Sequence, residues 1–312
     1  MIWIIGTGLM SREYAKVLKA LNKEFIAIGK GEENCALFEK EYSVKTIRGG
    51  LNDFLKTKPP IPESVIVGVG IEALTETTIA LLNYGIGKIL LEKPGVGYAS
   101  EITAVSELVK EQNAHVLLAY NRRFYSSVIQ AQKIIKDDGG VVSFNFEFTE
   151  WSHLIRNLKK HKTEHHNWFL GNSTHVIDTA FYLGGNPKEL CAFFKGGLDW
   201  HPASSVFAGA GVSENNALFS YQANWEGPGR WVIELITPIH RLIFKPMETL
   251  QIQNIGSVAV EPVLVDDHLD KEFKPGIYLQ TETFIKGDYS RFCSVQDQKN
   301  MIEKYYNKMS GY

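Results

Sequence analysis

The first 121 residues alternate short, continuous apolar runs with amphipathic stretches. The apolar runs cover 2–5, 25–28, 65–69, 88–91 and 116–119, and the clearest amphipathic stretches cover 11–21, 72–84 and 101–112. Uninterrupted apolar strands between helices are typical of a parallel sheet covered on both faces, because each right-handed crossover lays a helix on the sheet. The alternation therefore predicts a doubly wound α/β domain over residues 1–121.

The pattern changes after residue 121. An amphipathic stretch over 126–136 is followed by alternating apolar and polar residues over 142–148, which indicates an antiparallel strand with one solvated or partner-covered face. Similar runs recur near 189–195, 217–225, 230–236, 239–245 and 249–255, and helices are expected near 174–183 and 295–308. The sequence thus predicts a second, α+β domain over 122–312, built on a large, mostly antiparallel open sheet.

The 312 residues carry a formal net charge of −2, which provides no general attraction for nucleic acid or an anionic membrane surface. No apolar stretch approaches the ~20 residues that cross a bilayer, and the N-terminus lacks a signal-like pattern. Cys35, Cys191 and Cys293 are odd in number and far apart, which is typical of reduced thiols. We expect a cytoplasmic protein that binds neither nucleic acid nor membrane.

The strongest local signal is a glycine turn after the first apolar run. The run leads into Gly6-Thr7-Gly8-Leu9-Met10-Ser11, and an amphipathic stretch follows. In such a turn the first glycine permits a tight bend, the second lets the backbone approach a pyrophosphate, and the N–H groups of the next helix bind that anion. We expect a Rossmann fold whose dinucleotide contacts Gly6, Thr7, Gly8, Leu9 and Met10, and also Val69 at the end of a later strand.

The second apolar run ends at Gly29-Lys30-Gly31. An NAD-preferring domain places Asp or Glu here, on the ribose hydroxyls, and that acid is missing. Lys30 can instead neutralise a ribose 2′-phosphate, which favours NADP over NAD as the cofactor. The alternative is a solvated lysine at a loop tip, and the nearby Glu32 and Glu33 weaken the preference.

Three further motifs follow the glycine turn in order. They are Glu92-Lys93-Pro94-Gly95 after the run at 88–91, Asn121-Arg122-Arg123-Phe124, and His175-Val176-Ile177-Asp178. With the turn, they resemble the glucose–fructose oxidoreductase and inositol dehydrogenase family, Gfo/Idh/MocA, over nearly the whole chain. The resemblance implies an NAD(P)-dependent oxidoreductase and a homodimer or homotetramer formed through the open face of the second sheet. It also implies a cis Lys93-Pro94 peptide bond.

The resemblance further implies that Lys93 lies beside the nicotinamide, between the cofactor contacts Glu92 and Pro94, and that His175 is the general acid/base. Oxidising an alcohol requires a proton acceptor while hydride leaves, and imidazole, with an unperturbed pKa of about 6.5, suits proton transfer at neutral pH. Lys93 is then the charge that polarises the reacting oxygen. Both side chains are expected to face one cleft between the domains.

One position departs from the family pattern. Members commonly carry Asp four residues before the histidine, and here that position is Gly171, followed by Asn172. An amide can orient a hydroxyl but cannot relay a proton, so the usual Lys–Asp–His set is incomplete. The expected substrate contacts are Asn121, Arg122, Trp168, Asn172 and Asp178. Asp178, one helical turn beyond His175, either orients that ring or stabilises packing within its own domain.

The segment 151–168 is rich in aromatic, histidine and basic residues. Its rings can stack on sugars and its cations can hold a phosphate, or it is simply an exposed, solvated basic loop. It contains no metal-ligand motif, and we expect no metal.

Three functions remain open at this point. The first is a dehydrogenase of a sugar, cyclitol or sugar nucleotide. The second is a reductase of another small carbonyl, imine or tetrapyrrole-like compound, which the missing Asp favours slightly. The third is a cofactor-binding protein without turnover. Fold alone does not separate them, because function depends on the site.

Overall fold

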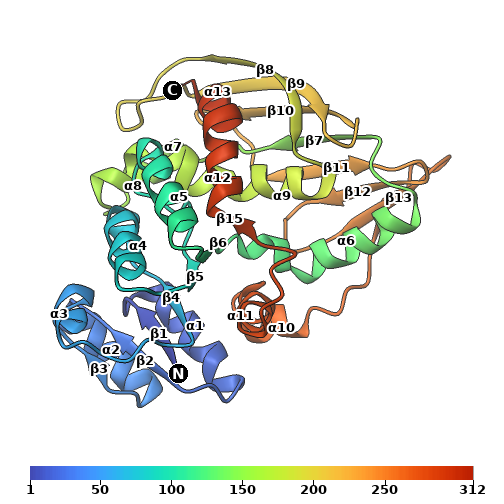
Figure 1. Cartoon of the computed structure of the whole chain (residues 1–312). Coiled ribbons are helices and arrows are strands. Elements are labelled where there is room, and N and C mark those ends of the chain that lie inside the picture. The colour runs from blue at the N-terminus through green and yellow to red at the C-terminus, as the bar shows by residue number, and fades with distance from the viewer. Residues whose placement is uncertain (312) are drawn as a thin grey trace. The chain divides into compact units, whose positions relative to one another are not determined.

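The structure is a computed structural model that describes residues 1–311, and its contacts divide the chain into two compact units (Figure 1). The first unit comprises Met1–Asn121 and Leu269–Lys299. The second comprises Arg122–His268 and the residues from Asn300 onward. Across the described residues, no helix is long and apolar enough to span a bilayer.

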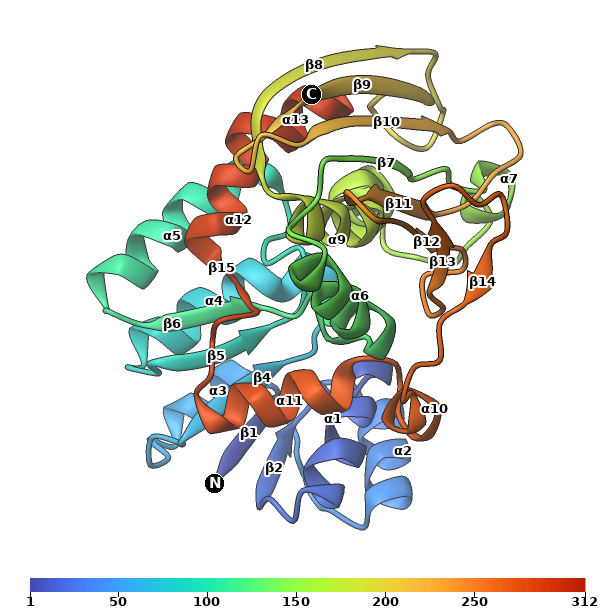
Figure 2. The ribbon, with the colours of Figure 1, turned by 90° about the vertical axis from the view of Figure 1, so that its right-hand side faces the viewer.

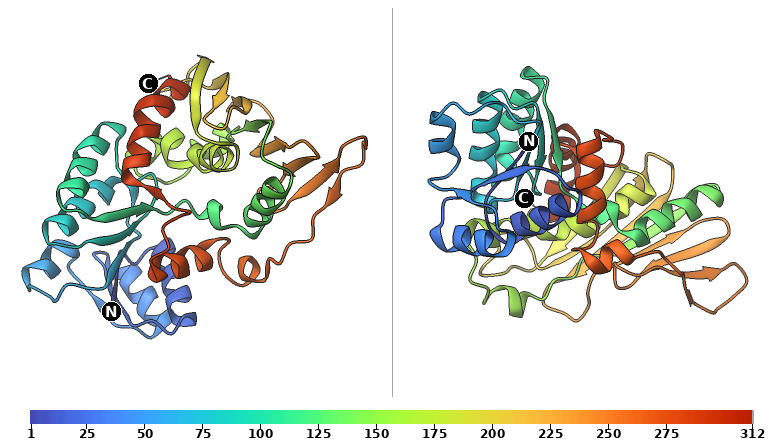
Figure 3. Two further views of the ribbon diagram at one scale, coloured as in Figure 1. Left: turned by 45° about the vertical axis from the view of Figure 1, so that its right-hand side comes forward. Right: turned by 90° about the horizontal axis from the view of Figure 1, so that it is seen from below.

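The first unit contains a seven-stranded sheet in the order β15-β6-β5-β4-β1-β2-β3, parallel except at β15. Its strands are β1 (Ile2–Ile5), β2 (Phe25–Ile28), β3 (Thr46–Ile47), β4 (Ser64–Val67), β5 (Lys88–Leu91), β6 (His115–Leu118) and β15 (Cys293–Ser294). Its helices are α1 (Leu9–Ala20), α2 (Glu32–Tyr42), α3 (Leu51–Lys56), η1 (Ile71–Ala73), α4 (Leu74–Asn83), η2 (Ala99–Glu101), α5 (Ile102–Glu111) and α11 (Ile277–Lys286). Helices flank the sheet on both sides (Figure 3), which confirms the predicted doubly wound fold.

Burial explains why these runs form central strands. Every residue of β1 and β4 is buried, so neither face of these strands is solvated. The two strands pair in parallel with Ile2 opposite Ser64, and β1 pairs on its other side with β2. Parallel strands therefore end at one common edge, where the connecting loops carry the predicted cofactor residues.

The segment Leu269–Lys299 departs from the predicted division at residue 121, because it belongs to the first unit. Helix α11 packs against α1 (Figure 2), with Ile277 and Phe284 buried. Strand β15 extends the sheet antiparallel to β6, pairing Cys293 with Leu118. The short α10 (His268–Glu272) begins this segment, and the segment ends within α12 (Val295–Met301). The chain returns to the first unit because apolar side chains of α11 are buried against α1, and because the edge strand β6 has backbone groups that can pair with β15.

The second unit contains an eight-stranded sheet in the order β14-β13-β12-β11-β7-β10-β9-β8. Its strands are β7 (Ser143–Glu147), β8 (Pro187–Lys195), β9 (Val206–Ser213), β10 (Leu218–Asn224), β11 (Val232–Ile236), β12 (His240–Phe244), β13 (Gln251–Asn254) and β14 (Glu261–Pro262). Its helical segments are η3 (Asn121–Phe124), α6 (Ser126–Asp137), α7 (Ser152–Ile155), α8 (Lys162–His166), η4 (Phe169–Ser173), α9 (Thr174–Gly184), η5 (Ile302–Tyr306) and α13 (Asn307–Ser310). All strand pairs are antiparallel except β7 with β10, so the predicted mostly antiparallel sheet is confirmed.

The apolar residues that alternate with polar ones along β7 form part of the core of this unit. Phe144 and Phe146 are buried, and α9 packs across β7 and β11, as Figure 2 shows beneath β7. Phe181 of α9 meets Phe146 edge-on, with ring centroids 5.4 Å apart. Strand β9 was not among the predicted strands, because its Ala and Gly residues weaken the apolar alternation that marks the others.

Candidate active site

The glycine turn connects β1 to α1, as the sequence predicts. Gly6 has a φ of 103°, and a Cβ at this position would lie 2.7 Å from the carbonyl oxygen of Gly68, so only glycine fits. Ser11 takes the third position of the motif, where it is fully buried and donates from Oγ to the Gly68 oxygen at 3.1 Å. At Gly8, the N-cap of α1, a Cβ would meet nothing within 4 Å.

This geometry fits a dinucleotide. The first-turn amides of a helix lack intrahelical acceptors, and the open space at Gly8 lets a pyrophosphate approach them. Thr7 is buried inside the turn, Leu9 is exposed, and Met10 is half-buried. Val69 is half-buried in the loop after β4, the neighbour of β1. The predicted cofactor residues therefore lie at the carboxyl ends of adjacent strands.

Lys30 lies exposed in the loop after β2. The nearby Glu32 forms an ion pair with Arg48, which also pairs with Glu39 at 3.0 Å. Glu32 is thus already neutralised by a cation of its own unit. Lys30 remains a positive charge at the strand end that the adenosine ribose of a Rossmann cofactor approaches.

Glu92, Lys93 and Pro94 follow β5, which is the next strand beyond β4. The Lys93-Pro94 peptide bond is cis, which confirms the sequence prediction. Glu92 is buried, and it accepts a hydrogen bond of 2.8 Å from the Tyr14 hydroxyl on α1. Burial raises the pKa of Glu92, and the charge of Lys93 offsets part of that shift. Lys93 itself is half-buried, and its charge acts on the buried Glu92 at the strand edge.

Gln298 fixes the backbone of this turn. Its Nε2 donates to the carbonyl oxygen of Pro94 at 3.1 Å and to the Tyr120 hydroxyl at 3.0 Å, and its side chain is fully buried. The returning segment of the first unit therefore holds the Lys93 turn in place. Sequence reasoning missed Gln298, since nothing in its local pattern distinguishes it from a solvated helix residue.

Asn121 and Asp178 have structural partners. The Asn121 side-chain amide donates to the Pro275 carbonyl oxygen at 3.0 Å, which ties β6 to the returning segment. Asp178, 4% exposed, accepts from Arg123 Nε at 2.8 Å and from the Arg123 terminal nitrogen at 2.6 Å. Both oxygens of Asp178 are thus occupied by this ion pair. Of the two roles considered for Asp178 beside substrate contact, the arrangement favours packing within its own unit.

His175 and Asn172 lie in the second unit, on α9 and on the π-helical turn η4 that precedes it. His175 is 9% exposed, and its ring centroid lies 6.2 Å from that of Trp231. Asn172 donates to Glu150 Oε1 at 2.8 Å, and Ser173 donates to the same oxygen at 3.0 Å. Gly171, where the family usually carries Asp, is thus adjacent to a residue that hydrogen-bonds a buried carboxyl group.

Glu150, Arg230 and Trp231 were not predicted from the sequence. Arg230 donates to Glu150 Oε2 at 3.1 Å, and its guanidinium lies 4.6 Å from the Trp231 ring centroid. The Arg122 guanidinium lies 4.7 Å from the same centroid. Burial raises the pKa of Glu150, and the charge of Arg230 offsets part of that shift. The second unit therefore brings Arg122, Asn172 and His175 together with three residues from distant segments.

Trp168 lies in a different environment. Its ring is buried in an aromatic cluster with His165 and Trp200, at centroid distances of 6.3 and 6.1 Å. The basic segment forms the short helices α7 and α8, and most of its lysines and Arg156 are exposed. No cluster of His, Cys, Asp or Glu in residues 1–311 could hold a metal ion.

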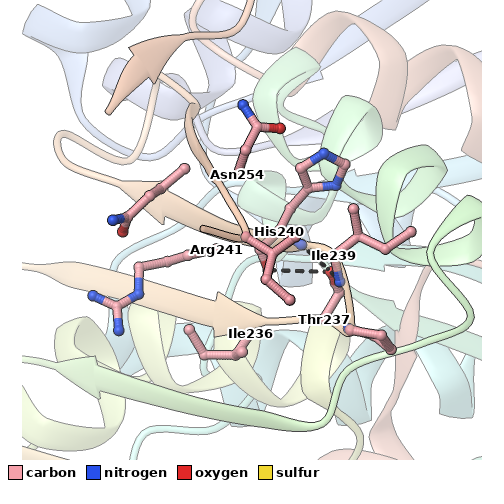
Figure 4. A pocket seen from close by; sticks show the side chains of 9 residues that line it. Ile236, Thr237, Ile239, His240, Arg241 and Asn254 are labelled. Carbon is pink, nitrogen blue, oxygen red and sulfur yellow. Dashed lines mark hydrogen bonds between the residues drawn. The ribbon is translucent and has the colours of Figure 1, made fainter. Parts of the chain in front are cut away.

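The pocket in Figure 4 lies elsewhere, at the β11–β12 turn and β13 of the second unit, and has a volume of about 270 Å³. Thr237 Oγ1 accepts hydrogen bonds from the backbone of Ile239 and His240 there, and the Thr237 hydroxyl and the His240 ring each hydrogen-bond Asp138 at 2.7 Å. None of the predicted site residues lines this pocket. These hydrogen bonds close a strand turn, and we assign the pocket no role.

The glycine turn after β1 and the Lys93 turn after β5 lie at the same carboxyl edge of the parallel sheet, with β4 between the two strands, which is the edge where a doubly wound fold binds its ligand. Residues 1–120 match the model of the Gfo/Idh/MocA family, described as "Oxidoreductase family, NAD-binding Rossmann fold". The match covers the N-terminal part of the chain, which carries the glycine turn and the Lys93 turn, and it agrees with the resemblance that the motifs indicate. No curated protein shows significant sequence similarity to it.

Solved structures share the fold over nearly the whole chain. A levoglucosan dehydrogenase in complex with NADH has a TM-score of 0.78 and 17% identity, covering 99% of this chain and 95% of that one. A UDP-N-acetylglucosamine 3-dehydrogenase from Acidithiobacillus ferrooxidans has a TM-score of 0.74 and 12% identity, covering 99% of this chain and 96% of that one. An oxidoreductase from Agrobacterium radiobacter in complex with NAD+, L-tartaric acid and magnesium has a TM-score of 0.75 and 12% identity, covering 99% of this chain and 95% of that one.

Proposed function

We propose that this oxidoreductase transfers hydride between a nicotinamide cofactor and a hydroxyl-bearing carbon of a carbohydrate derivative. The observation that carries the proposal is Lys93, half-buried beside Glu92 at the strand edge where the glycine turn binds the dinucleotide. The names of the similar structures support a sugar substrate, because two of them are dehydrogenases of a sugar or a sugar nucleotide.

Different residues of the chain have separate roles in cofactor binding and catalysis. Gly6, Gly8 and the first turn of α1 hold the pyrophosphate of the cofactor, which supplies or accepts the hydride. Lys93 stabilises negative charge on the reacting oxygen, and His175 takes the hydroxyl proton during oxidation or returns it during reduction. With Gly171 in place of the usual Asp, proton transfer depends on His175 alone.

Turnover with a panel of sugars, sugar acids and sugar phosphates tests this function. We expect reduced nicotinamide to form with at least one of them, and to form much more slowly in Lys93→Met, because the variant lacks the polarising charge. Cofactor binding without turnover on any compound of the panel would instead support the non-enzymatic alternative.

We further propose that the enzyme prefers NADP, with Lys30 binding the 2′-phosphate. Lys30→Ala is expected to weaken NADP binding about tenfold or more, the range for one charge-assisted hydrogen bond, while NAD binding changes little. Titration calorimetry with both cofactors measures this, and Lys110→Ala, which removes an exposed lysine from α5, is the matched control. Equal losses for the two cofactors would refute the assignment.

For assembly, we propose that two copies pair through the outer face of the second sheet. Phe193 and Leu218 are exposed on that face, at 70% and 62%. Sedimentation velocity should show a dimer or tetramer that Phe193→Glu combined with Leu218→Glu dissociates, and a monomeric wild type would contradict the proposal. We also propose a cytoplasmic location, which the odd number and wide spacing of Cys35, Cys191 and Cys293 in the sequence support.

A further inference from the structure

Two guanidinium groups share one indole ring in the second unit. Arg122 and Arg230 both lie over Trp231, at 4.7 and 4.6 Å from its ring centroid. Arg122 also lies 5.7 Å from the Tyr125 ring centroid, and Arg230 lies 4.9 Å from that of Trp151. Stacking on a ring engages the face of a guanidinium and leaves its in-plane N–H groups available as donors. The cluster therefore holds two guanidinium groups in fixed positions, and their N–H groups can donate further hydrogen bonds.

The cluster contains two positively charged guanidinium groups, but among the described residues only one carboxylate pairs with them. Glu150 pairs with Arg230 at 3.1 Å, and its other oxygen accepts from Asn172 and Ser173. The Arg122 side chain has no ion pair and no hydrogen bond within residues 1–311, and its Nε is buried without an acceptor. Burial and the nearby charge of Arg230 lower the pKa of Arg122, while Tyr125, Glu248 and Glu150 act in the opposite direction. One guanidinium thus remains without a partner anion.

Trp231 adds a second unused donor. Its ring is 8% exposed, and Nε1 is buried with no acceptor within the described part of the chain. A buried donor left unsatisfied is destabilising, so native proteins rarely keep two together without a ligand or ordered water. The centroid of the Trp231 ring lies 6.2 Å from that of His175, the proposed acid/base. Whatever accepts from these donors lies close to the reacting group.

We propose that the substrate carries an anionic group, a carboxylate or a phosphate, which accepts hydrogen bonds from Arg122 Nε and Trp231 Nε1. Arg230, fixed by Glu150, adds positive charge to this subsite. The inference rests on the proposed function, since it names the class of its substrate: an acidic or phosphorylated sugar whose oxidised carbon lies a few bonds from the anion. Charge-assisted bonds to a guanidinium favour such a group over a neutral hydroxyl.

Calorimetric titration of the cofactor-saturated enzyme with D-glucuronate, D-glucose 6-phosphate and D-glucose tests the proposal. We expect one anionic probe to bind at least tenfold more tightly than D-glucose, and the better probe identifies carboxylate or phosphate as the anion. Arg122→Gln should weaken that probe about tenfold to hundredfold, the range for one lost charge-assisted bond, and leave D-glucose unchanged.

Two further variants sharpen the test. Trp231→Phe keeps the stacking surface but removes the N–H, so it should weaken the anionic probe by less than Arg122→Gln does. Arg241→Gln removes an exposed arginine of β12 from the same unit, and it should change no affinity. If Arg122→Gln does not fold, Trp231→Phe carries the test alone.

The inference would be overturned by equal affinity for all three probes, or by no binding of either anionic probe. It would also be overturned if the preference for an anion survives in Arg122→Gln. Where Arg122→Gln does not fold, the same result in Trp231→Phe would overturn it. Turnover is read separately. An enzyme that oxidises sugars without an anion preference keeps the proposed function and loses the subsite. An enzyme that binds an anionic probe through Arg122 but never reduces a nicotinamide keeps the subsite and loses the function.

Discussion

Replacing His175 by alanine is expected to lower kcat by roughly 100- to 10,000-fold, the range for losing a positioned acid/base. The imidazole is the proposed proton acceptor, and Gly171 supplies no carboxylate that could replace it. Binding of the cofactor should change little, because the glycine turn that holds it belongs to the other unit. Steady-state kinetics with a turned-over sugar, together with cofactor titration, measure both quantities.

His153→Ala is the matched control, since His153 is an exposed histidine on α7 of the same unit. It should leave kcat within about twofold of the wild type, as surface substitutions usually do. A His175→Ala enzyme that keeps its full rate and its pH profile would show that the proton goes to another group, and the His165-His166 segment would then be the next candidate.

Removal of the Arg123 guanidinium should destabilise the second unit by about 3–5 kcal/mol. Arg123→Ala leaves the Asp178 carboxylate, only 4% exposed, without the two hydrogen bonds of 2.8 and 2.6 Å that compensate its burial. An unpaired buried charge is much more costly than the pair is stabilising, so Arg123→Ala combined with Asp178→Asn should recover part of the loss. Urea denaturation followed by tryptophan fluorescence measures the free energy of unfolding.

The exposed pair of Arg241 and Glu234, at 3.7 Å, provides the comparison. Arg241→Ala should cost less than about 1 kcal/mol, because solvent screens such pairs. A similar, small loss for Arg123→Ala would mean that water or another donor satisfies Asp178, and the structural role assigned to this carboxylate would be wrong.

Local sequence patterns were sufficient to locate the two turns to which the proposed function assigns the nucleotide. The turn from Gly6 to Ser11 and the turn at Lys93 each depend on residues that are consecutive in the chain, so strand, turn and helix signals locate them directly. Parallel pairing then fixes their neighbourhood, because the carboxyl ends of β1, β4 and β5 meet at one edge.

The proposed substrate half depends on contacts that no local pattern encodes. Glu150 follows β7 and Trp231 precedes β11, two strands that are neighbours in the sheet but far apart in the sequence. Only the pairing of these strands brings Glu150 and Arg230 to within 3.1 Å. The same reason applies to the Leu269–Lys299 segment, whose place in the first unit follows from long-range burial on α1.

Transfer of deuterium from a sugar to the cofactor tests the central claim most directly. A sugar that is turned over is labelled at the carbon to be oxidised, and the nicotinamide is analysed by mass spectrometry after a single turnover. We predict that the label appears at C4 of the nicotinamide in the wild type, and much more slowly in His175→Ala and Lys93→Met. Label that never reaches the cofactor, or that reaches it at the wild-type rate in both variants, would contradict the account.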